Sequence, residues 1–288
     1  AARRHPRQFD TLVRLSGFSH GTDVWAGNIR ELITSGTATV NETVGCRDDI
    51  MIYLISKGFE PSLAFKTMEA VRKGKVKKTG AFPGDAEKQM REKGVPDWYI
   101  ESCRKIAYLF PKAHAVAYVM MAFRIAWFKV HMPLAFYSAY FYRRSQKGGF
   151  DAQLMCGGTD DVRRKINEMK KRQLSANEED LLVTLEAVYE FNMRGFEFAP
   201  IDLYASEATK FAIVDDKRLR PPFVSISGLG ESAAWDLARC KDSGRQFISI
   251  EELSAACPKV SQTHLETLKA LGALGDMPES NQLNLFDM

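Results

Sequence analysis

Residues 115–141 form the longest apolar stretch of the chain and limit what it can fold into. A stretch of this length either crosses a membrane or forms a helix in a protein core. Arg124 and Lys129 lie inside it, and each costs about 2.5–3.5 kcal/mol at the centre of a bilayer. His131 and Pro133 interrupt it further. The pattern therefore predicts a buried helix that breaks near Pro133, and no membrane span.

Composition and charge narrow the class of protein further. With 45% hydrophobic and 26% charged residues, the 288-residue chain has the composition of a globular protein of one to two domains. The small net charge of +4 hides an asymmetry. Residues 1–150 hold 24 basic and 13 acidic residues, whereas residues 151–288 hold 16 and 23. A polyanion is therefore the expected partner of the first half.

The five cysteines are far apart in the sequence and form no CxxC pair. This spacing argues against both a disulfide framework and a zinc ribbon, so free thiols in a reducing cytoplasm are expected. The chain opens on Ala1-Ala2 with neither an initiator methionine nor an apolar signal segment. We therefore expect it to be part of a longer, cytoplasmic protein.

Glycine, proline and capping residues predict the helix boundaries. Residues 19–22 are expected to start a helix that Asp23 caps, and Asp48 to open another. Pro61 occupies a favoured first position of the next helix. Residues 211–224 alternate like a small hairpin. The prediction is a mainly α fold with a minor β element.

Five of the eight residues at positions 71–78 are basic. Such a run is either a solvated loop or a contact to the phosphate backbone of a nucleic acid, and the charge pattern leaves both open. The lysines assigned to the second alternative are Lys73, Lys75, Lys77 and Lys78.

Residues 226–230 have the pattern hydrophobic-x-Gly-hydrophobic-Gly before a predicted helix, which is typical of a helix-hairpin-helix. The glycines permit an unusual turn, and N–H groups at the following helix start can face a phosphate. A second helix and hairpin follow at 251–261. One such motif can be a mere packing turn, but two in tandem predict sequence-independent duplex binding. The contacts are assigned to Gly228, Leu229, Gly230, Lys259 and Ser261.

In a helix that begins at Lys112, the side chains of His114, Tyr118 and Lys129 lie within about 60° of one another around the helix axis, on one face. This face suits a nucleotide, because rings stack on a base and cations bind phosphates. The alternative is a core helix in which the two rings find internal partners and Lys129 extends to solvent. Spacing alone favours this alternative.

The acidic residues do not suggest an active site. Three pairs are adjacent in sequence, and neighbouring side chains diverge, so they make poor clamps for two metal ions. The sequence contains no D-x-D, HExxH or P-loop pattern. We therefore expect no catalytic residue and no metal ligand in this chain. The pairs are Asp48-Asp49, Asp160-Asp161 and Asp215-Asp216.

The last residues of the chain place apolar side chains after a polar lead-in that begins at Pro278. Exposed apolar residues on a tail indicate a partner that buries them, and docking on the chain's own domain is the alternative. The residues concerned are Gln282, Leu283, Leu285 and Phe286.

Several of these segments together resemble the PolC-type DNA polymerase III alpha subunit, a bacterial C-family replicative polymerase. The resemblance covers roughly residues 9–286. It rests on SHGTDVW at 19–25, GCRDDIM at 45–51 and PKAHAVAY at 111–118, with RGF at 194–196, DLY at 202–204 and the segment from Pro278 to Phe286.

The resemblance implies a fingers region, a tandem helix-hairpin-helix domain and a tail that binds the bacterial beta sliding clamp. Fingers residues Lys112, His114 and Tyr118, with Arg47 and Lys129, would hold the incoming deoxynucleoside triphosphate. The family reaction is template-directed nucleotidyl transfer with Mg²⁺ ions, which a palm outside this chain would hold. Primer–template DNA and other replisome subunits are the further expected partners.

The predicted organisation follows from these segments. Residues 1–150 are assigned to a partial fingers region, 151–198 to connecting helices, 199–276 to the tandem helix-hairpin-helix domain and 277–288 to the clamp-binding tail. Two alternatives remain open. One is a non-catalytic adaptor that binds DNA and tethers a clamp; the other is the DNA-binding end of a repair nuclease, which leaves residues 19–51 unexplained.

Overall fold

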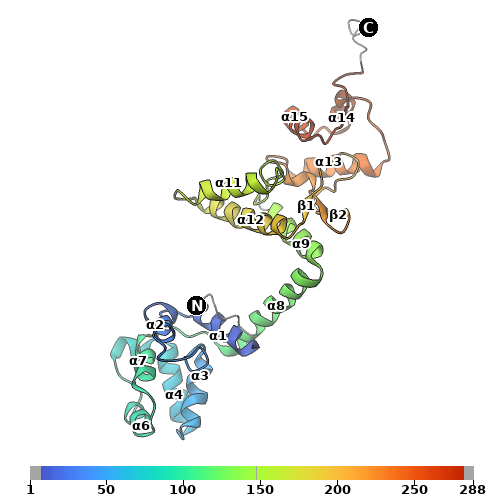
Figure 1. Ribbon diagram of the computed structural model, residues 1–288. Helices are drawn as coiled ribbons and strands as arrows, with labels where there is room; N and C mark the ends of the chain where they lie inside the picture. The colour runs from blue at the N-terminus through green and yellow to red at the C-terminus, as the bar shows by residue number, and fades with distance from the viewer. Residues whose placement is uncertain (1–7, 147, 282–288) are drawn as a thin grey trace. The chain divides into compact units, whose positions relative to one another are not determined.

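The computed structural model of the chain describes residues 8–146 and 148–281 and is mainly helical with one small sheet, which confirms the predicted fold class (Figure 1). The chain divides into a first unit, Ala1–Ile125, and a second unit, Ala126–Met288. The division falls inside one long helix, whereas the sequence places the first boundary at residue 150.

The first unit consists of short helices. Its elements are α1 (Phe9–His20), η1 (Trp25–Ile29), α2 (Arg30–Thr34), α3 (Arg47–Ser56), α4 (Pro61–Arg72), α5 (Lys75–Thr79), α6 (Ala86–Glu92) and α7 (Asp97–Lys105), and α8 (Lys112–His131) follows them.

The second unit combines a helical layer with the only sheet in the part of the chain that the structure describes. Its helices are α9 (Pro133–Ser145), α10 (Ala152–Met155), α11 (Thr159–Met169), α12 (Ala176–Met193), η2 (Phe223–Ser225), α13 (Glu231–Asp242), α14 (Ile250–Ala256) and α15 (Gln262–Ala270). Its strands are β1 (Glu197–Phe198), β2 (Ala212–Ile213) and β3 (Arg218–Arg220).

The sheet has the order β1-β3-β2, with β2 antiparallel to β3 and β1 parallel to it. The predicted hairpin over 211–224 is therefore confirmed. Asp215 stabilises its turn, because its Oδ1 accepts the N–H groups of Lys217 at 2.9 Å and Arg218 at 2.8 Å.

Most predicted helix boundaries are confirmed, but the one at residues 19–23 is wrong. Ser19 and His20 end α1, and the N–H of Gly21 closes that helix on the carbonyl of Gly17 at 2.9 Å. Asp23 has a left-handed backbone with φ of 57° and caps no helix. Its carboxylate instead accepts Lys77 Nζ at 2.6 Å, so a distant cation takes the place of the expected helix N–H.

The core of the first unit lies between α3 and α4. Ile50 and Leu54 of α3 and Ala64, Met68 and Val71 of α4 are all buried. Burial of one such large aliphatic side chain contributes about 1.5–3 kcal/mol relative to exposure. This packing holds in place the turn before α3, which carries functional candidates.

Gly17 brings α1 against that turn. A Cβ at this position would lie 2.1 Å from the carbonyl oxygen of Gly45, so no larger residue fits without moving the backbone. Val13 of α1, Cys46 and two residues of α8, Ala115 and Val119, form a small buried cluster beside this contact. The turn at 45–46 is thus clamped between α1 and α8.

The core of the second unit is aromatic. The rings of Phe191 and Phe198 lie 4.8 Å apart, those of Phe150 and Phe211 lie 4.9 Å apart, and the buried Phe141 contacts all four. These rings come from α9, α12, β1 and the connecting segments, which explains how helices and a very small sheet share one core.

The long apolar helix differs from its prediction in one respect. It ends at His131, before Pro133 starts α9, so the predicted break is confirmed. The prediction that this helix is buried is wrong, because only Ala115 and Val119 of α8 are buried. Apolar residues occur on all sides of this helix, and one helix packed at its first turns cannot bury them all. By length and composition alone, α8 is the one helix among residues 8–146 and 148–281 that is able to cross a membrane.

Candidate nucleic-acid interface

The carboxylates of Asp48 and Asp49 organise the start of α3. Asp49 Oδ2 accepts the N–H groups of Gly45 at 3.0 Å and Cys46 at 2.9 Å, and Asp48 Oδ2 accepts the N–H of Lys112 at 2.9 Å. Both carboxylates are thus occupied by backbone donors, from the turn before α3 and from the first residue of α8. The pair stabilises helix ends instead of presenting two free oxygens to a metal.

Lys112 belongs to the same network. Its Nζ lies 3.4 Å from Asp49 Oδ1 and 3.3 Å from Asp10 Oδ1, and Arg14 Nη1 lies 3.4 Å from the other Asp49 oxygen. Partial burial favours the neutral amine, but the carboxylates of Asp49 and Asp10 outweigh it and raise the pKa of Lys112. The side chain predicted to bind a phosphate is therefore charged and ion-paired.

Four rings gather on the surface where α1 ends and α8 begins; we call His20, Phe110, His114 and Tyr118 the ring surface. The His20 and Phe110 rings stack with centroids 5.1 Å apart, and Tyr118 lies 6.2–6.4 Å from each of the other three. Tyr118 is 60% exposed and both histidines are exposed. The geometry offers flat faces at a solvent-accessible site.

A group of cations surrounds Glu69; we call Arg47, Arg72 and Lys73 the cation cluster. Arg72 Nε donates to Glu69 Oε1 at 2.7 Å, Lys73 Nζ lies 2.9 Å from Oε2, and Arg47 Nη1 lies 3.8 Å from Oε1. The bonds from Arg72 and then Lys73 lower the pKa of Glu69 to about 2. Three cations thus share one permanently ionised carboxylate.

Arg47 connects the two groups of side chains. Its N–H donates to the carbonyl of Phe110 at 3.2 Å, so the cation cluster adjoins the ring surface. Its buried Nε has no hydrogen-bond acceptor among the described residues, although Asp48 Oδ2 lies 3.7 Å away. A buried charged donor of this kind is best satisfied by an anion.

The basic run at 71–78 folds as the end of α4 and the short helix α5, with Val76 buried. Lys77 and Lys73 are ion-paired with Asp23 and Glu69. Lys75 and Lys78 are exposed, and the described residues offer them no ion pair. These two lysines are the ones available to a phosphate backbone.

Lys129 belongs to the second unit, whereas the ring surface belongs to the first. It is fifteen residues beyond His114 on α8. Its Nζ is 2.7 Å from the Glu190 carboxylate and lies over the Phe136 ring at 5.4 Å. The structure therefore places it in the second unit, on a carboxylate of α12.

The first hairpin has the geometry expected of a phosphate-binding turn. Gly228 has φ of 79°, and the neighbouring Leu229 is buried and anchors the turn. A Cβ on Gly230 would meet no atom within 4 Å, so the backbone here faces open space. The N–H groups of Ala233 and Ala234 both donate to the Gly230 carbonyl at 3.0 Å, so those of Glu231 and Ser232 are the ones that the start of α13 leaves for an outside acceptor.

The second hairpin lies beside the first. Val260 anchors it in the core, and the Ser261 hydroxyl accepts the N–H of His264 at 3.3 Å to start α15. His264 Nε2 would be 3.7 Å from a Cβ on Gly228, so the two turns are neighbours. Lys259 Nζ lies 3.9 Å from the Asp236 carboxylate, which Arg239 also contacts.

The comparisons with known proteins agree with this arrangement. Residues 1–94 match the bacterial DNA polymerase III alpha subunit finger domain, and residues 195–283 match a helix-hairpin-helix motif. The chain is 50% identical to the PolC-type DNA polymerase III of Bacillus cereus over 283 residues, 98% of this chain and 19% of that protein. The proteins of Streptococcus thermophilus and Thermotoga maritima are 49% and 48% identical, again over 98% of the chain.

The chain belongs to the PolC-type DNA polymerase III family. It spans about a fifth of the length of the curated relatives that it matches. The finger-domain match includes the end of α1, the turn at 45–49 and the cation cluster. The helix-hairpin-helix match includes both hairpins. Family membership and the resemblance stated from the sequence are thus confirmed.

Several residues of this finger region escape sequence reasoning. His20 and Phe110 are ninety positions apart, and Glu69 is a single carboxylate within an ordinary amphipathic helix. Only the packing of α1 on α8 and of α3 on α4 brings them to Arg47 and Tyr118. The signal in the sequence was the motif around His20, which reads as a helix start until the fold shows that α1 ends there.

The four residues assigned to clamp binding lie outside the described residues: Gln282, Leu283, Leu285 and Phe286. The residues just before them are held in place by backbone hydrogen bonds. Pro278 and Glu279 carbonyls accept the N–H groups of Ile250 at 2.9 Å and Glu251 at 3.0 Å. The tail therefore starts from a defined point beside α14.

Proposed function

We propose that this chain is the part of a replicative DNA polymerase that binds the incoming nucleotide and the primer–template duplex and attaches to the beta sliding clamp. Template-directed nucleotidyl transfer belongs to the full-length parent, in the cytoplasm and with other replisome subunits. The observation that carries the proposal is the contact between the ring surface and the cation cluster, in a unit whose residues 1–94 match the DNA polymerase III finger domain.

The two groups suit the two ends of a deoxynucleoside triphosphate. Flat rings such as His20 and Tyr118 stack on a base, and Arg47 with its unsatisfied Nε takes a phosphate oxygen. Mg²⁺ would bind the same triphosphate and supply charge neutralisation. As the family resemblance implies, its protein ligands would come from the palm of the parent.

In the full-length parent, Tyr118→Ala is expected to raise the nucleotide KM about tenfold, since one base–aromatic stack contributes about 1–3 kcal/mol. Duplex affinity should change much less. Phe123→Ala is the matched control, because Phe123 is on the same helix, is also 60% exposed and lies outside the ring surface. Steady-state primer extension and duplex titration measure the two quantities. An equal effect of both variants on KM would remove the ring surface from nucleotide binding.

Duplex binding by the hairpins is tested at Gly230. Gly230→Val should fold, since a Cβ there meets nothing, yet should weaken duplex affinity about tenfold by holding the backbone away from the phosphate. Affinity should fall with salt along a shallow slope, because few cations lie near the hairpins. Ala270→Val, at the far end of α15, places the same side chain on an exposed helix position as a control. Fluorescence anisotropy with unrelated duplexes reports the result; unchanged affinity in folded Gly230→Val contradicts the assignment.

A further inference from the structure

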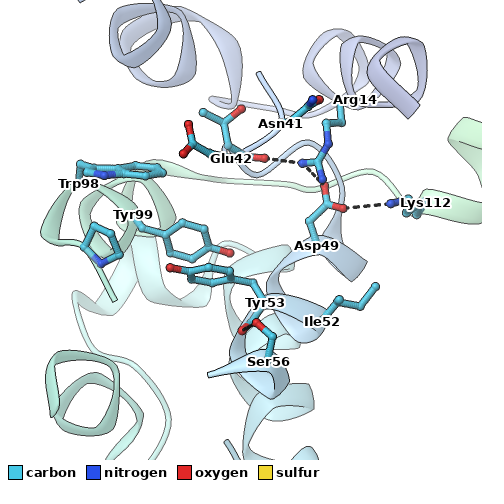
Figure 2. A pocket seen from close by; sticks show the side chains of 12 residues that line it. Arg14, Asn41, Glu42, Asp49, Ile52, Tyr53, Ser56, Trp98, Tyr99 and Lys112 are labelled. Atoms are coloured by element: carbon cyan, nitrogen blue, oxygen red, sulfur yellow. Dashed lines mark hydrogen bonds and ion pairs between the residues drawn. The ribbon is translucent and has the colours of Figure 1, made fainter. Parts of the chain in front are cut away.

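A pocket of about 410 Å³ opens in the first unit, on the side of the turn before α3 where Arg14 and Thr43 lie (Figure 2). This volume falls within the range of about 300–1,000 Å³ that small-molecule sites occupy. Tyr53 comes from α3, while Trp98 and Tyr99 come from α7. None of these three side chains belongs to the ring surface or to the cation cluster.

The Tyr99 hydroxyl is the first reason to expect a ligand. Tyr99 is 2% exposed, and its hydroxyl has no hydrogen-bond partner among the described residues. Burial raises the pKa of Tyr99 well above its ordinary value, so the group stays a neutral O–H donor. Figure 2 shows this hydroxyl directed toward the Asp49 side of the pocket. A buried hydroxyl without a partner is costly, and a ligand in the pocket can satisfy it.

The walls of the pocket are the second reason. The Tyr53 and Tyr99 rings lie 4.5 Å apart at 33°, and Trp98 meets Tyr99 edge to face at 5.7 Å. Figure 2 shows the indole above the two phenol rings and Ser56 at the lower rim. Asn41 adds an amide at the edge. Flat apolar faces with a few polar groups at the rim suit a planar heterocycle that has donors and acceptors along its edge.

The charges lining the pocket are balanced. Arg14 and Lys112 both contact Asp49, and the Glu42 carboxylate accepts the N–H of Thr39 at 2.8 Å. The lining therefore contains two cations and two anions, all with partners. A triphosphate requires an excess of cations, as in the cation cluster, so the ligand of this pocket is uncharged where it is held.

From these observations we infer that the pocket binds a nucleobase, stacked against Trp98 and Tyr53 and hydrogen-bonded to the Tyr99 hydroxyl. The choice of a nucleobase among planar heterocycles rests on the proposed function. Two sources share this chemistry: a free nucleoside and an unpaired base of a single DNA strand near the fingers. The site is separate from the ring surface, which takes the incoming nucleotide.

The test uses the full chain and its Tyr99→Phe variant, which removes one hydroxyl and keeps the ring. The probes are thymidine, deoxyadenosine, a short oligothymidylate and the same strand with abasic sites. We expect the strand with bases to bind about tenfold tighter than the abasic strand, at low and high salt alike, because the pocket is neutral. Tyr99→Phe should reduce this preference about fivefold, the loss of one hydrogen bond. Tyr189→Phe, in α12, is the matched control.

Each outcome decides the inference. A Tyr99-dependent preference for the base-carrying strand supports it with the strand as the source; Tyr99-dependent binding of nucleosides alone supports it with the free nucleoside as the source. Equal binding of both strands with no nucleoside binding overturns it. A clear drop in the unfolding temperature of Tyr99→Phe also overturns it, because the hydroxyl would then already be satisfied. Duplex affinity of the same chain, tested through Gly230, is independent and reports on the proposed function alone.

Discussion

The isolated chain is expected to incorporate no nucleotide on a primed template, even with abundant Mg²⁺ and all four deoxynucleoside triphosphates. Two-metal nucleotidyl transfer needs carboxylates whose oxygens are free to hold the ions. Asp48 and Asp49 are occupied by backbone N–H groups and by Lys112. Asp215 accepts two backbone N–H groups and pairs with Arg218.

The measurement is single-turnover extension of a labelled primer, with the full-length parent as the positive control. The parent should extend the primer and the chain should leave it unchanged, a difference limited only by detection. Asp49→Asn and Asp215→Asn variants of the chain identify a contaminant, since residual synthesis that both variants retain does not come from these carboxylates. Robust Mg²⁺-dependent synthesis by the chain that disappears in either variant would contradict the assignment of the metal site to the parent.

The sequence predicted best those features that depend on local chemistry. Pro61 and Pro133 each start a helix in the structure, because proline fixes φ and needs no N–H partner in the first turn. A helix opens at Asp48 as expected, and Gly228 adopts the positive φ that its hairpin requires. In each case the neighbouring residues alone supply the physical reason, so a reader of the sequence can find it.

Features that depend on distant partners could not be predicted in this way. Asp23 has the residue type of a helix cap, but Lys77, 54 positions later, takes its carboxylate. Lys112 and Lys129 share a helix and both have carboxylate partners, yet those partners lie in different units. The periodicity of α8 shows which residues share a face but contains no information on which carboxylates the fold brings to them.

The second large effect is expected on clamp binding, when apolar residues of the tail at 277–288 are replaced. The pattern of the tail places Leu285 and Phe286 next to each other after a glutamine, and such short segments bind by inserting a few side chains into preformed pockets. Burial of each apolar side chain contributes about 1.5–3 kcal/mol, which ordering of the segment partly offsets. Micromolar affinity for the beta sliding clamp is therefore expected of a peptide covering residues 278–288.

Leu285→Ala with Phe286→Ala should abolish binding at micromolar clamp, because losing about 3–6 kcal/mol weakens a micromolar complex about 10²- to 10⁴-fold, to a Kd of hundreds of micromolar or more. Asn284→Ala is the matched control, since it changes a residue between the assigned positions.

On duplex DNA, the full chain should bind the clamp more tightly than the isolated peptide does. The Pro278 and Glu279 carbonyls accept N–H groups at the start of α14, so the tail begins in the same unit as the hairpins. A duplex bound to the hairpins therefore raises the effective concentration of the tail at a clamp on the same DNA. Titration of labelled peptide with clamp, repeated with the full chain on duplex, measures both effects; equal binding by the double variant would leave the tail without this role.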